Sequence, residues 1–350
     1  MGVTRQSVKS VSASALRTWV DALVRTRTLY GVQEREERFV FDRLERARDL
    51  RLDYDVTLLP PKKYFLPQKE VLSTFDRYTM KFEAVFEAEP FVVFGVHPYD
   101  VEAIRQLDII FRKDNADAHY LARREAATIV ALDVESPSKD VFAGCMGHAT
   151  GKKLDGFDLL LTRIDDEGTY LLDSRTEKGH ALLDEAAAAT EATAEQLKLR
   201  RAVWQRNGER LKQHKLELHP SDLPDLLTRS EEHPVWAEKA ELCYSCGACN
   251  LVCPTCYCFD VQDEMEWDLA RGKRVRTWDG CMLAGFAEVA GGHNFRDQRA
   301  ERYRHRYYRK GKYSYDMIGE ISCVGCGRCI SACTVEIANP VEIFNRLLDK

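Results

Sequence analysis

The spacing of apolar residues predicts a helix near the beginning of the chain. Between residues 12 and 31, apolar side chains recur every three to four positions, as they do on one face of a helix, at Leu16, Val20, Leu23 and Val24. Ser12 or Ser14 is suited to cap the first turn, and Gly31 is suited to end the helix. We therefore expect an amphipathic helix over 12–31.

Longer apolar runs predict strands that are buried inside a sheet. Residues 90–96 (PFVVFGV) and 128–134 (TIVALDV) are almost continuously apolar, which is typical of a central strand. Residues 54–60 (YDVTLLP) are also rich in strand-forming residues and end at a proline pair. The stretch 97–111 between the two apolar runs has helical spacing. This alternation predicts a mixed α/β fold.

A hairpin and a change of composition divide the rest of the chain. Residues 157–173 (FDLLLTRIDDEGTYLLD) predict two strands that turn at Glu167-Gly168. Helix-forming residues then dominate up to about residue 218, and a cysteine-rich block with many glycines follows. The expected class is α+β, with a mixed α/β domain at 1–180, a helical connector at 181–234 and a ferredoxin-like domain with two [4Fe-4S] clusters at 235–350.

Composition and charge restrict the classes of function. The chain has 350 residues, of which 45% are hydrophobic and 31% charged, with a formal net charge of −5. This is the composition of a globular protein, and the charge gives no reason to expect nucleic acid as a partner. No apolar run reaches the roughly 20 residues that a membrane span needs, and the first residues lack the apolar core of a signal peptide. We expect a cytoplasmic protein without membrane insertion.

The cysteines are the strongest chemical signal in the sequence. Eleven of the twelve lie between Cys243 and Cys333, and Cys145 stands apart. In a cytoplasmic chain such a concentration favours metal or redox chemistry over disulfides. The spacing C-x2-C-x2-C-x3-C occurs twice, at 243–253 and at 323–333.

This spacing is typical of proteins that hold two iron–sulfur cubes. The first three cysteines of each copy bind one cluster, and the fourth binds the other cluster. The first cluster is therefore assigned to Cys243, Cys246, Cys249 and Cys333, and the second to Cys323, Cys326, Cys329 and Cys253. Zinc is the alternative, but two overlapping tetrads with this core are a poor zinc pattern. Thr334 stands where proline usually follows the fourth cysteine, which affects the direction of the chain and removes no sulfur ligand.

Four further cysteines leave two interpretations open. They are Cys145, Cys256, Cys258 and Cys281. One interpretation is a third [4Fe-4S] cluster, in which Cys145 reaches across from the N-terminal domain. The other is that some of them are buried as small apolar residues, as free cysteines often are. The C-x-C pair at 256–258 favours the cluster.

Several polar residues have a functional and a structural interpretation. His293 and Arg296, in GGHNFR, either tune or dock near a cluster or serve the local fold. The basic stretch 295–310 either offsets the negative charge of thiolate-bound clusters, docks an acidic partner or forms a solvated helix. His97 and Asp100 follow a predicted strand, where α/β sheets often bind ligands. A self-contained enzyme with a substrate site there is thus an alternative, although no nucleotide-binding glycine motif is present.

The chain resembles the iron–sulfur beta subunits of cytoplasmic nickel–iron sulfhydrogenases and the related A subunit of anaerobic sulfite reductase. The stretches that carry the resemblance are LPPKKYF (59–65), FVVFGVHPYDVEAIRQLD (91–108), HPVWAEKAELCYSCGACNLVCPTCYCFDVQD (233–263), RTWDGCMLAGFAEVAGGHNFR (276–296) and CVGCGRCISAC (323–333). The family often has a C-F-C pair near 140–145, and this chain keeps only Cys145 there.

The resemblance implies an electron-transfer subunit without a catalytic residue of its own. Its partners would be a flavin- and NAD(P)-binding subunit and the small and large nickel–iron hydrogenase subunits. Two related complexes would have another terminal partner in place of the hydrogenase. In the sulfite reductase branch this partner is a siroheme subunit, and a complex like heterodisulfide reductase is the other possibility. The expected activity is an electron relay between the flavin subunit and the hydrogenase module.

Overall fold

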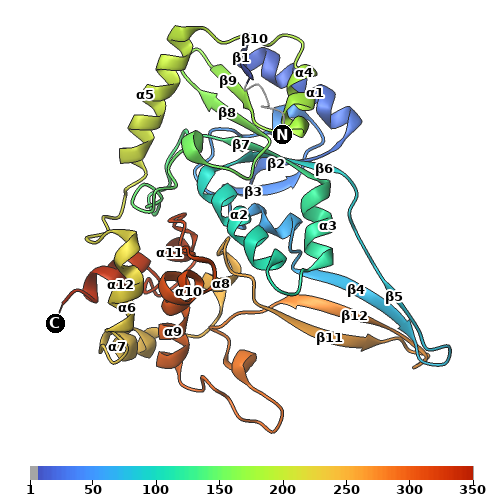
Figure 1. The fold of residues 1–350 in the computed structure, drawn as a ribbon, viewed down its shortest axis with the longest axis vertical. Coiled ribbons are helices and arrows are strands. Elements are labelled where there is room, and N and C mark those ends of the chain that lie inside the picture. The colour runs from blue at the N-terminus through green and yellow to red at the C-terminus, as the bar shows by residue number, and fades with distance from the viewer. Residues whose placement is uncertain (1–6, 350) are drawn as a thin grey trace.

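The computed structural model describes residues 7–349, and their strands form two sheets (Figure 1). The larger sheet has eight strands in the order β10-β1-β9-β8-β7-β6-β2-β3. Their bounds are β1 Ser7–Ser12, β2 Thr28–Arg35, β3 Arg38–Arg43, β6 Phe91–Val96, β7 Ala127–Leu132, β8 Leu159–Arg163, β9 Thr169–Ser174 and β10 Thr190–Glu191. Strands β2, β6, β7 and β8 are parallel to one another, and the pairs β2–β3, β8–β9, β9–β1 and β1–β10 are antiparallel.

The predicted central strands and their helix are confirmed. Strand β6 and strand β7 are almost wholly buried, because helices and neighbouring strands cover a parallel sheet on both faces. The stretch 97–111 forms α2 (Pro98–Arg112), and the predicted hairpin is β8–β9. Gly168 takes a φ of +85° in its turn, a conformation that glycine adopts without strain.

Two predictions in the first sixty residues are wrong in part. Helix α1 (Ala13–Thr26) begins at the predicted cap, where the Ser12 hydroxyl accepts a bond of 3.3 Å from the Ala15 N–H. It does not end at Gly31, which lies in β2 and packs so closely on the Leu50 side chain that a Cβ would come within 2.8 Å of it. The segment 54–60 forms no strand but a loop with one isolated bridge at Thr57. Tyr54 and Thr57 are buried, the Thr57 carbonyl accepts a bond from Arg328, and Leu58 is 53% exposed.

The smaller sheet combines strands from both ends of the chain and extends away from the larger one (Figure 1). Its order is β11-β12-β4-β5, all antiparallel, with β4 at Lys69–Asp76, β5 at Lys81–Ala84, β11 at Phe259–Met265 and β12 at Arg271–Trp278. A buried ionic network holds it to the larger domain, because Arg276 on β12 and Arg123 on α3 both bind the carboxylate of Glu70. The sequence did not reveal this sheet.

Helices make up most of the remaining structure. The helices are α3 Ala118–Ala126, α4 Glu177–Asp184, α5 Ala194–Arg210, α6 Leu223–Thr228, α7 Val235–Leu242, α8 Ala248–Leu251, α9 Arg299–Tyr308, α10 Ser314–Ile318, α11 Arg328–Ser331 and α12 Pro340–Arg346. Single turns of 3-10 helix occur at Ala47–Asp49, Pro61–Tyr64, Gly151–Lys153, Pro220–Asp222 and Ala284–Ala287, and a π-helical turn at Arg309–Tyr313 follows α9. None of the helices described is long and apolar enough to cross a membrane. The division of the chain at residues 180 and 235 stays a prediction.

Candidate metal centres

The two cysteine motifs have the same local structure. In each, the first two cysteines lie in an extended loop and a glycine with positive φ, Gly247 or Gly327, starts a short helix. That helix, α8 or α11, carries the third cysteine, and the fourth follows within a few residues of its end. Helices α8 and α11 pack against each other. The duplication in sequence is therefore also a duplication in structure, and the two copies are neighbours.

The four thiols assigned to the second cluster line one small cavity. They are Cys253, Cys323, Cys326 and Cys329. Burial raises the pKa of Cys323 and of Cys326 to about 12, and the neighbouring sulfurs add to the effect. Buried thiols of this kind become thiolates when a metal supplies the opposing positive charge. The cavity thus has the donor set and the environment that suit a metal cluster.

Cys253 crosses from the first motif to this cavity. Its sulfur lies 3.4 Å from the Thr255 hydroxyl, which in turn donates a bond of 2.6 Å to the Ser322 carbonyl. A side-chain hydrogen bond with Cys256 lowers the pKa of Cys253, while burial acts against this shift and the Lys310 and Arg306 charges favour it. The first motif is in this way fixed against the start of the second.

The thiols assigned to the first cluster lie closer to the surface. Cys243 is buried and accepts a bond of 3.4 Å from the Ser245 N–H, whereas Cys246 is exposed. Burial raises the pKa of Cys249 to about 12, and Cys243, Cys281 and Cys329 are close enough to contribute. Cys333 packs against the same hydrophobic cluster as Cys249. The structure therefore brings three of these thiols to one region of the core and leaves Cys246 facing solvent.

A single zinc ion and a four-iron cube make different demands on their ligands. A structural zinc site needs its four ligands about 2.0–2.3 Å from one ion, whereas a four-iron cube places each thiolate on a different iron. Among residues 7–349, no three His, Cys, Asp or Glu side chains converge closely enough to hold one ion.

Two of the remaining cysteines contact one amide, and a third is near one of them. The buried Asn250 side chain donates bonds of 3.6 Å to the sulfurs of both Cys256 and Cys281. Burial raises the pKa of Cys258 to about 11, and the neighbouring Cys281 adds to this shift. Cys145 instead donates a bond of 3.4 Å to the His214 carbonyl. Cys256, Cys258 and Cys281 are thus a group, to which the structure does not join Cys145.

Buried cations surround these thiols. Arg306 on α9 and Lys310 in the π-helical turn that follows it lie against the cavity of the second tetrad. Lys62 reaches in from the N-terminal domain, donates a bond of 2.6 Å to the Cys256 carbonyl and lies 4.2 Å above the Trp278 ring. None of the three forms an ion pair with a carboxylate among the described residues. Because an unpaired buried charge is costly, these side chains suit an anionic group held by the thiols.

The sequence did not single out these cations. Arg306 and Lys310 belong to the basic stretch, but the sequence does not show which face of the helix is buried. His293 and Arg296 are on a loop: His293 is exposed and packs edge-on against Phe295, while Arg296 is half-buried. Burial raises the pKa of Cys281, and Arg296 is one of the positive groups that oppose this shift, after Arg306 and Lys310.

The N-terminal domain holds the second motif by an ion pair and by close backbone contact. Arg328 donates bonds of 2.6 and 2.7 Å to the two oxygens of Asp100 on α2, and both side chains are almost fully buried. Its other N–H groups donate to the carbonyl and hydroxyl of Thr57. A Cβ at Gly325 or Gly327 would come within 2.6 Å of the backbone of segment 140–143. Only glycine permits this contact.

The ends of the parallel strands, where the alternative hypothesis placed a substrate site, are occupied by structural contacts. His97 is fully buried, stacks on Tyr54 with ring centroids 3.9 Å apart, and bonds through Nδ1 to the Tyr99 hydroxyl at 2.6 Å. Asp100 is occupied by Arg328. The interpretation of these two residues as ligand-binding groups is replaced by a structural one, because the cysteine-rich block covers this edge of the sheet.

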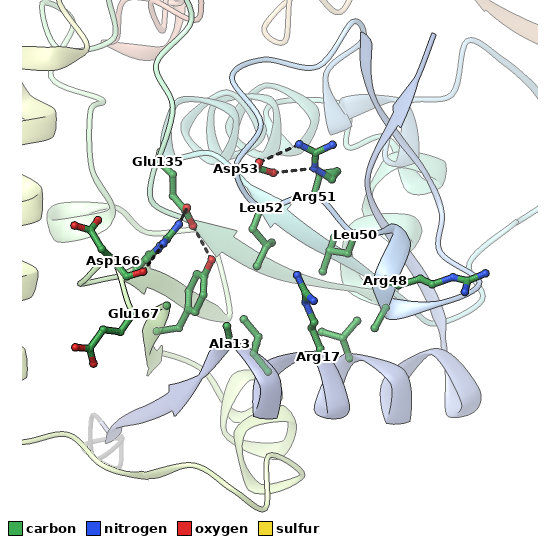
Figure 2. A pocket seen from close by; sticks show the side chains of 16 residues that line it. Ala13, Arg17, Arg48, Leu50, Arg51, Leu52, Asp53, Glu135, Asp166 and Glu167 are labelled. Atoms are coloured by element: carbon green, nitrogen blue, oxygen red, sulfur yellow. Dashed lines mark hydrogen bonds and ion pairs between the residues drawn. The ribbon is translucent and has the colours of Figure 1, made fainter. Parts of the chain in front are cut away.

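A separate hollow of about 400 Å³ lies beside α1 (Figure 2). Several of its charged side chains are paired: Arg51 pairs with Asp53 at 2.9 Å, and Glu135 accepts bonds from Arg163 and Tyr170. Burial raises the pKa of Glu135, and these two donors act in the opposite direction. Arg17, Arg48, Asp166 and Glu167 also line the hollow.

Comparisons with known proteins agree with this chemistry. Residues 242–337 match a family model described as a 4Fe-4S dicluster domain. The beta subunit of sulfhydrogenase 2 from Pyrococcus furiosus is 34% identical over 314 residues, which cover 88% of this chain and 89% of that protein. No solved structure matches the chain. The fold is thus α+β with a C-terminal [4Fe-4S] domain, and the chain belongs to the family of sulfhydrogenase beta subunits, iron–sulfur proteins of multisubunit complexes.

Proposed function

We propose that this subunit relays single electrons between a flavin- and NAD(P)-binding subunit and a nickel–iron hydrogenase module. The observation that carries the proposal is the convergence of Cys253, Cys323, Cys326 and Cys329 on one buried cavity. A cluster bound there supplies one-electron redox chemistry, with a potential set by burial, charge and hydrogen bonds. The chain itself supplies the thiolates, the buried cations and the exclusion of water.

The ligand assignment follows the crossed pattern of the two motifs. Cys243, Cys246, Cys249 and Cys333 hold the first cluster, and Cys323, Cys326, Cys329 and Cys253 hold the second. The close approach of Cys249 and Cys329, one on α8 and one on α11, supports two neighbouring clusters. Electrons then pass from one to the other within a single domain.

The first cluster is where a partner subunit makes electronic contact. Cys246 is exposed, and two large apolar side chains nearby in sequence, Leu242 and Tyr244, are 58% and 72% exposed. None of the thiols of the second tetrad is exposed, since Cys326 is buried and the other three are half-buried. An apolar rim around an exposed cluster ligand suits a redox partner that excludes water when it binds.

A third [4Fe-4S] cluster at Cys256, Cys258 and Cys281 completes the proposal. The shared contact with Asn250 and the buried Lys62 and Lys310 beside the group support it. We expect Cys258→Ser to lower iron and acid-labile sulfide by one cluster per chain, and Cys145→Ser tests separately whether that cysteine is the fourth ligand. Unchanged iron in Cys258→Ser would remove the third cluster.

The test of the function is an analysis of the native complex. The complex is purified anaerobically by an affinity tag on this subunit. It should contain nickel, iron and flavin and should reduce NAD(P) with hydrogen. Siroheme instead of nickel would place it in a sulfite reductase. A chain that copurifies with no flavin, nickel or siroheme subunit would contradict the relay.

The twelve free thiols support a location in the cytoplasm, where cysteines stay reduced.

A further inference from the structure

We propose that Arg306 is a positioning residue shared by the first two clusters, and that its fixed charge makes both of them easier to reduce. The inference rests on the ligand assignment proposed above. Arg306 is 2% exposed and lines the cavity of the second tetrad. It therefore acts from inside the core and not from the basic surface of its helix.

The guanidinium has unused hydrogen-bonding capacity where a cluster would lie. Within the described residues, its Nε and Nη1 atoms are buried and have no hydrogen-bond partner. Burial raises the pKa of Cys329, and Arg306 is the first of the groups that oppose this shift. Buried N–H groups without partners are rare in folded proteins and call for an explanation. Cluster sulfurs and thiolates are acceptors that would satisfy them.

Arg306 has thiols of both tetrads near it. Burial acts to lower the pKa of Arg306, but Cys249, from the first tetrad, and Cys329 and Cys253, from the second, raise it. Its neighbours differ in this respect. Arg328 is neutralised by Asp100, and Lys310 interacts with Cys253 and Cys256 but bonds through its ammonium to Thr255. Arg306 is the buried cation that faces thiols of both tetrads without a carboxylate among the described residues.

The expected effect follows from charge. When a cluster accepts one electron from a reductant, it becomes one unit more negative and takes up no proton from Arg306, which stays protonated at all accessible pH values. A nearby positive charge therefore stabilises the reduced form more than the oxidised form. Its attraction for each reduced cluster also offsets part of the repulsion between the two, which favours the state in which both hold an electron.

The test compares midpoint potentials in anaerobically purified holoprotein. Potentiometric titration followed by electron paramagnetic resonance is carried out on wild type, Arg306→Gln, Arg306→Lys and Arg304→Gln. Arg304 is the matched control, because it is on the same helix but binds Glu231 on the other side. We expect Arg306→Gln to lower the reduction equilibrium constant of both clusters at least tenfold, a shift of about 59 mV for a one-electron couple. Arg306→Lys and Arg304→Gln should stay within threefold of wild type.

Iron content separates the failure of this inference from failure of the ligand assignment. Full iron with both midpoints unchanged in Arg306→Gln, or a shift of one cluster alone, would overturn the shared role. If Arg306→Gln does not hold iron, the Arg306→Lys variant tests the role of charge. Cluster midpoint potentials near those of wild type in Arg306→Lys support this role. A tenfold change in the reduction equilibrium constant, or loss of iron, in Arg306→Lys overturns it. Wild-type protein without iron would instead contradict the assignment itself.

Discussion

Replacing Asp100 with alanine should loosen the second cluster loop by a large and measurable factor. Asp100 accepts two short bonds from Arg328, between Cys326 and Cys329, and both side chains are at most 2% exposed. Removing one partner of a buried pair leaves the other charge uncompensated and typically costs about 3–5 kcal/mol. At 1.36 kcal/mol per factor of ten, the open state of the loop should become about 100- to 5,000-fold more populated.

The rate at which a chelator captures iron from the folded protein measures this population. When opening and closing are fast relative to capture, the rate follows the equilibrium between closed and open states. The control is Glu238→Ala, which removes a surface pair of similar geometry, with bonds of 2.6 and 2.8 Å to Arg346. Exposed pairs contribute little, so this variant should release iron at the wild-type rate.

A double variant tests whether the cost comes from the unpaired charge. Asp100→Leu combined with Arg328→Met removes both charges, and replacement of a buried pair by apolar residues is often neutral. Most of the acceleration should therefore disappear. An iron-release rate within tenfold of wild type in Asp100→Ala would refute the reasoning. So would a double variant whose effect on this rate is the sum of the effects of its two single substitutions.

Three further predictions address the loop, the pH dependence and the partner surface. Gly327→Ala should lose the second cluster, because a φ of +79° strains alanine and the new Cβ would lie 2.4 Å from the Asp140 carbonyl. The measurement is iron per chain, with circular dichroism to show that the chain is still folded. Normal iron content would contradict this prediction. Burial lowers the pKa of His305 from 6.5 to about 4, so between these pH values the unfolded chain binds more protons and stability should fall as pH falls. In His305→Gln, the denaturation midpoint should depend less on pH between pH 6.5 and 4 than in wild type. An unchanged dependence would show that other groups cause it. Tyr244→Ser, which alters an exposed side chain near Cys246, should slow electron transfer from the partner while leaving cluster spectra unchanged, and equal rates would place the contact elsewhere.

The regular elements of the N-terminal domain could be predicted because their signals are local. The apolar runs that became β6 and β7 and the hairpin at Gly168 each depend on residues close together in the sequence. The segment 54–60 was predicted as a strand because its residues are apolar and strand-forming. Such composition does not specify a partner strand, and Arg328, which donates to the Thr57 carbonyl of this loop, lies 271 residues away.

The smaller sheet and the buried cations could not be predicted, because they depend on contacts between residues that are far apart in the sequence. Strand β11 has mostly exposed side chains, so it lacks the alternation that marks a half-buried strand. Arg306 is indistinguishable in sequence from the solvated arginines on the same helix. The cysteine spacing, by contrast, determines its chemistry within eleven residues, which is why the motifs could be identified without a structure.

The pairing of β12 with β4 has a consequence for engineering and for evolution. Seven residue pairs join the two strands, from Arg271 with Asp76 to Thr277 with Lys69. A truncated product that begins near residue 235 would keep both motifs but lose β4 and expose the edge of β12 to aggregation. This chain is therefore not a detachable ferredoxin fused to a scaffold, and its electron carrier should be moved between hosts only together with the first hundred residues.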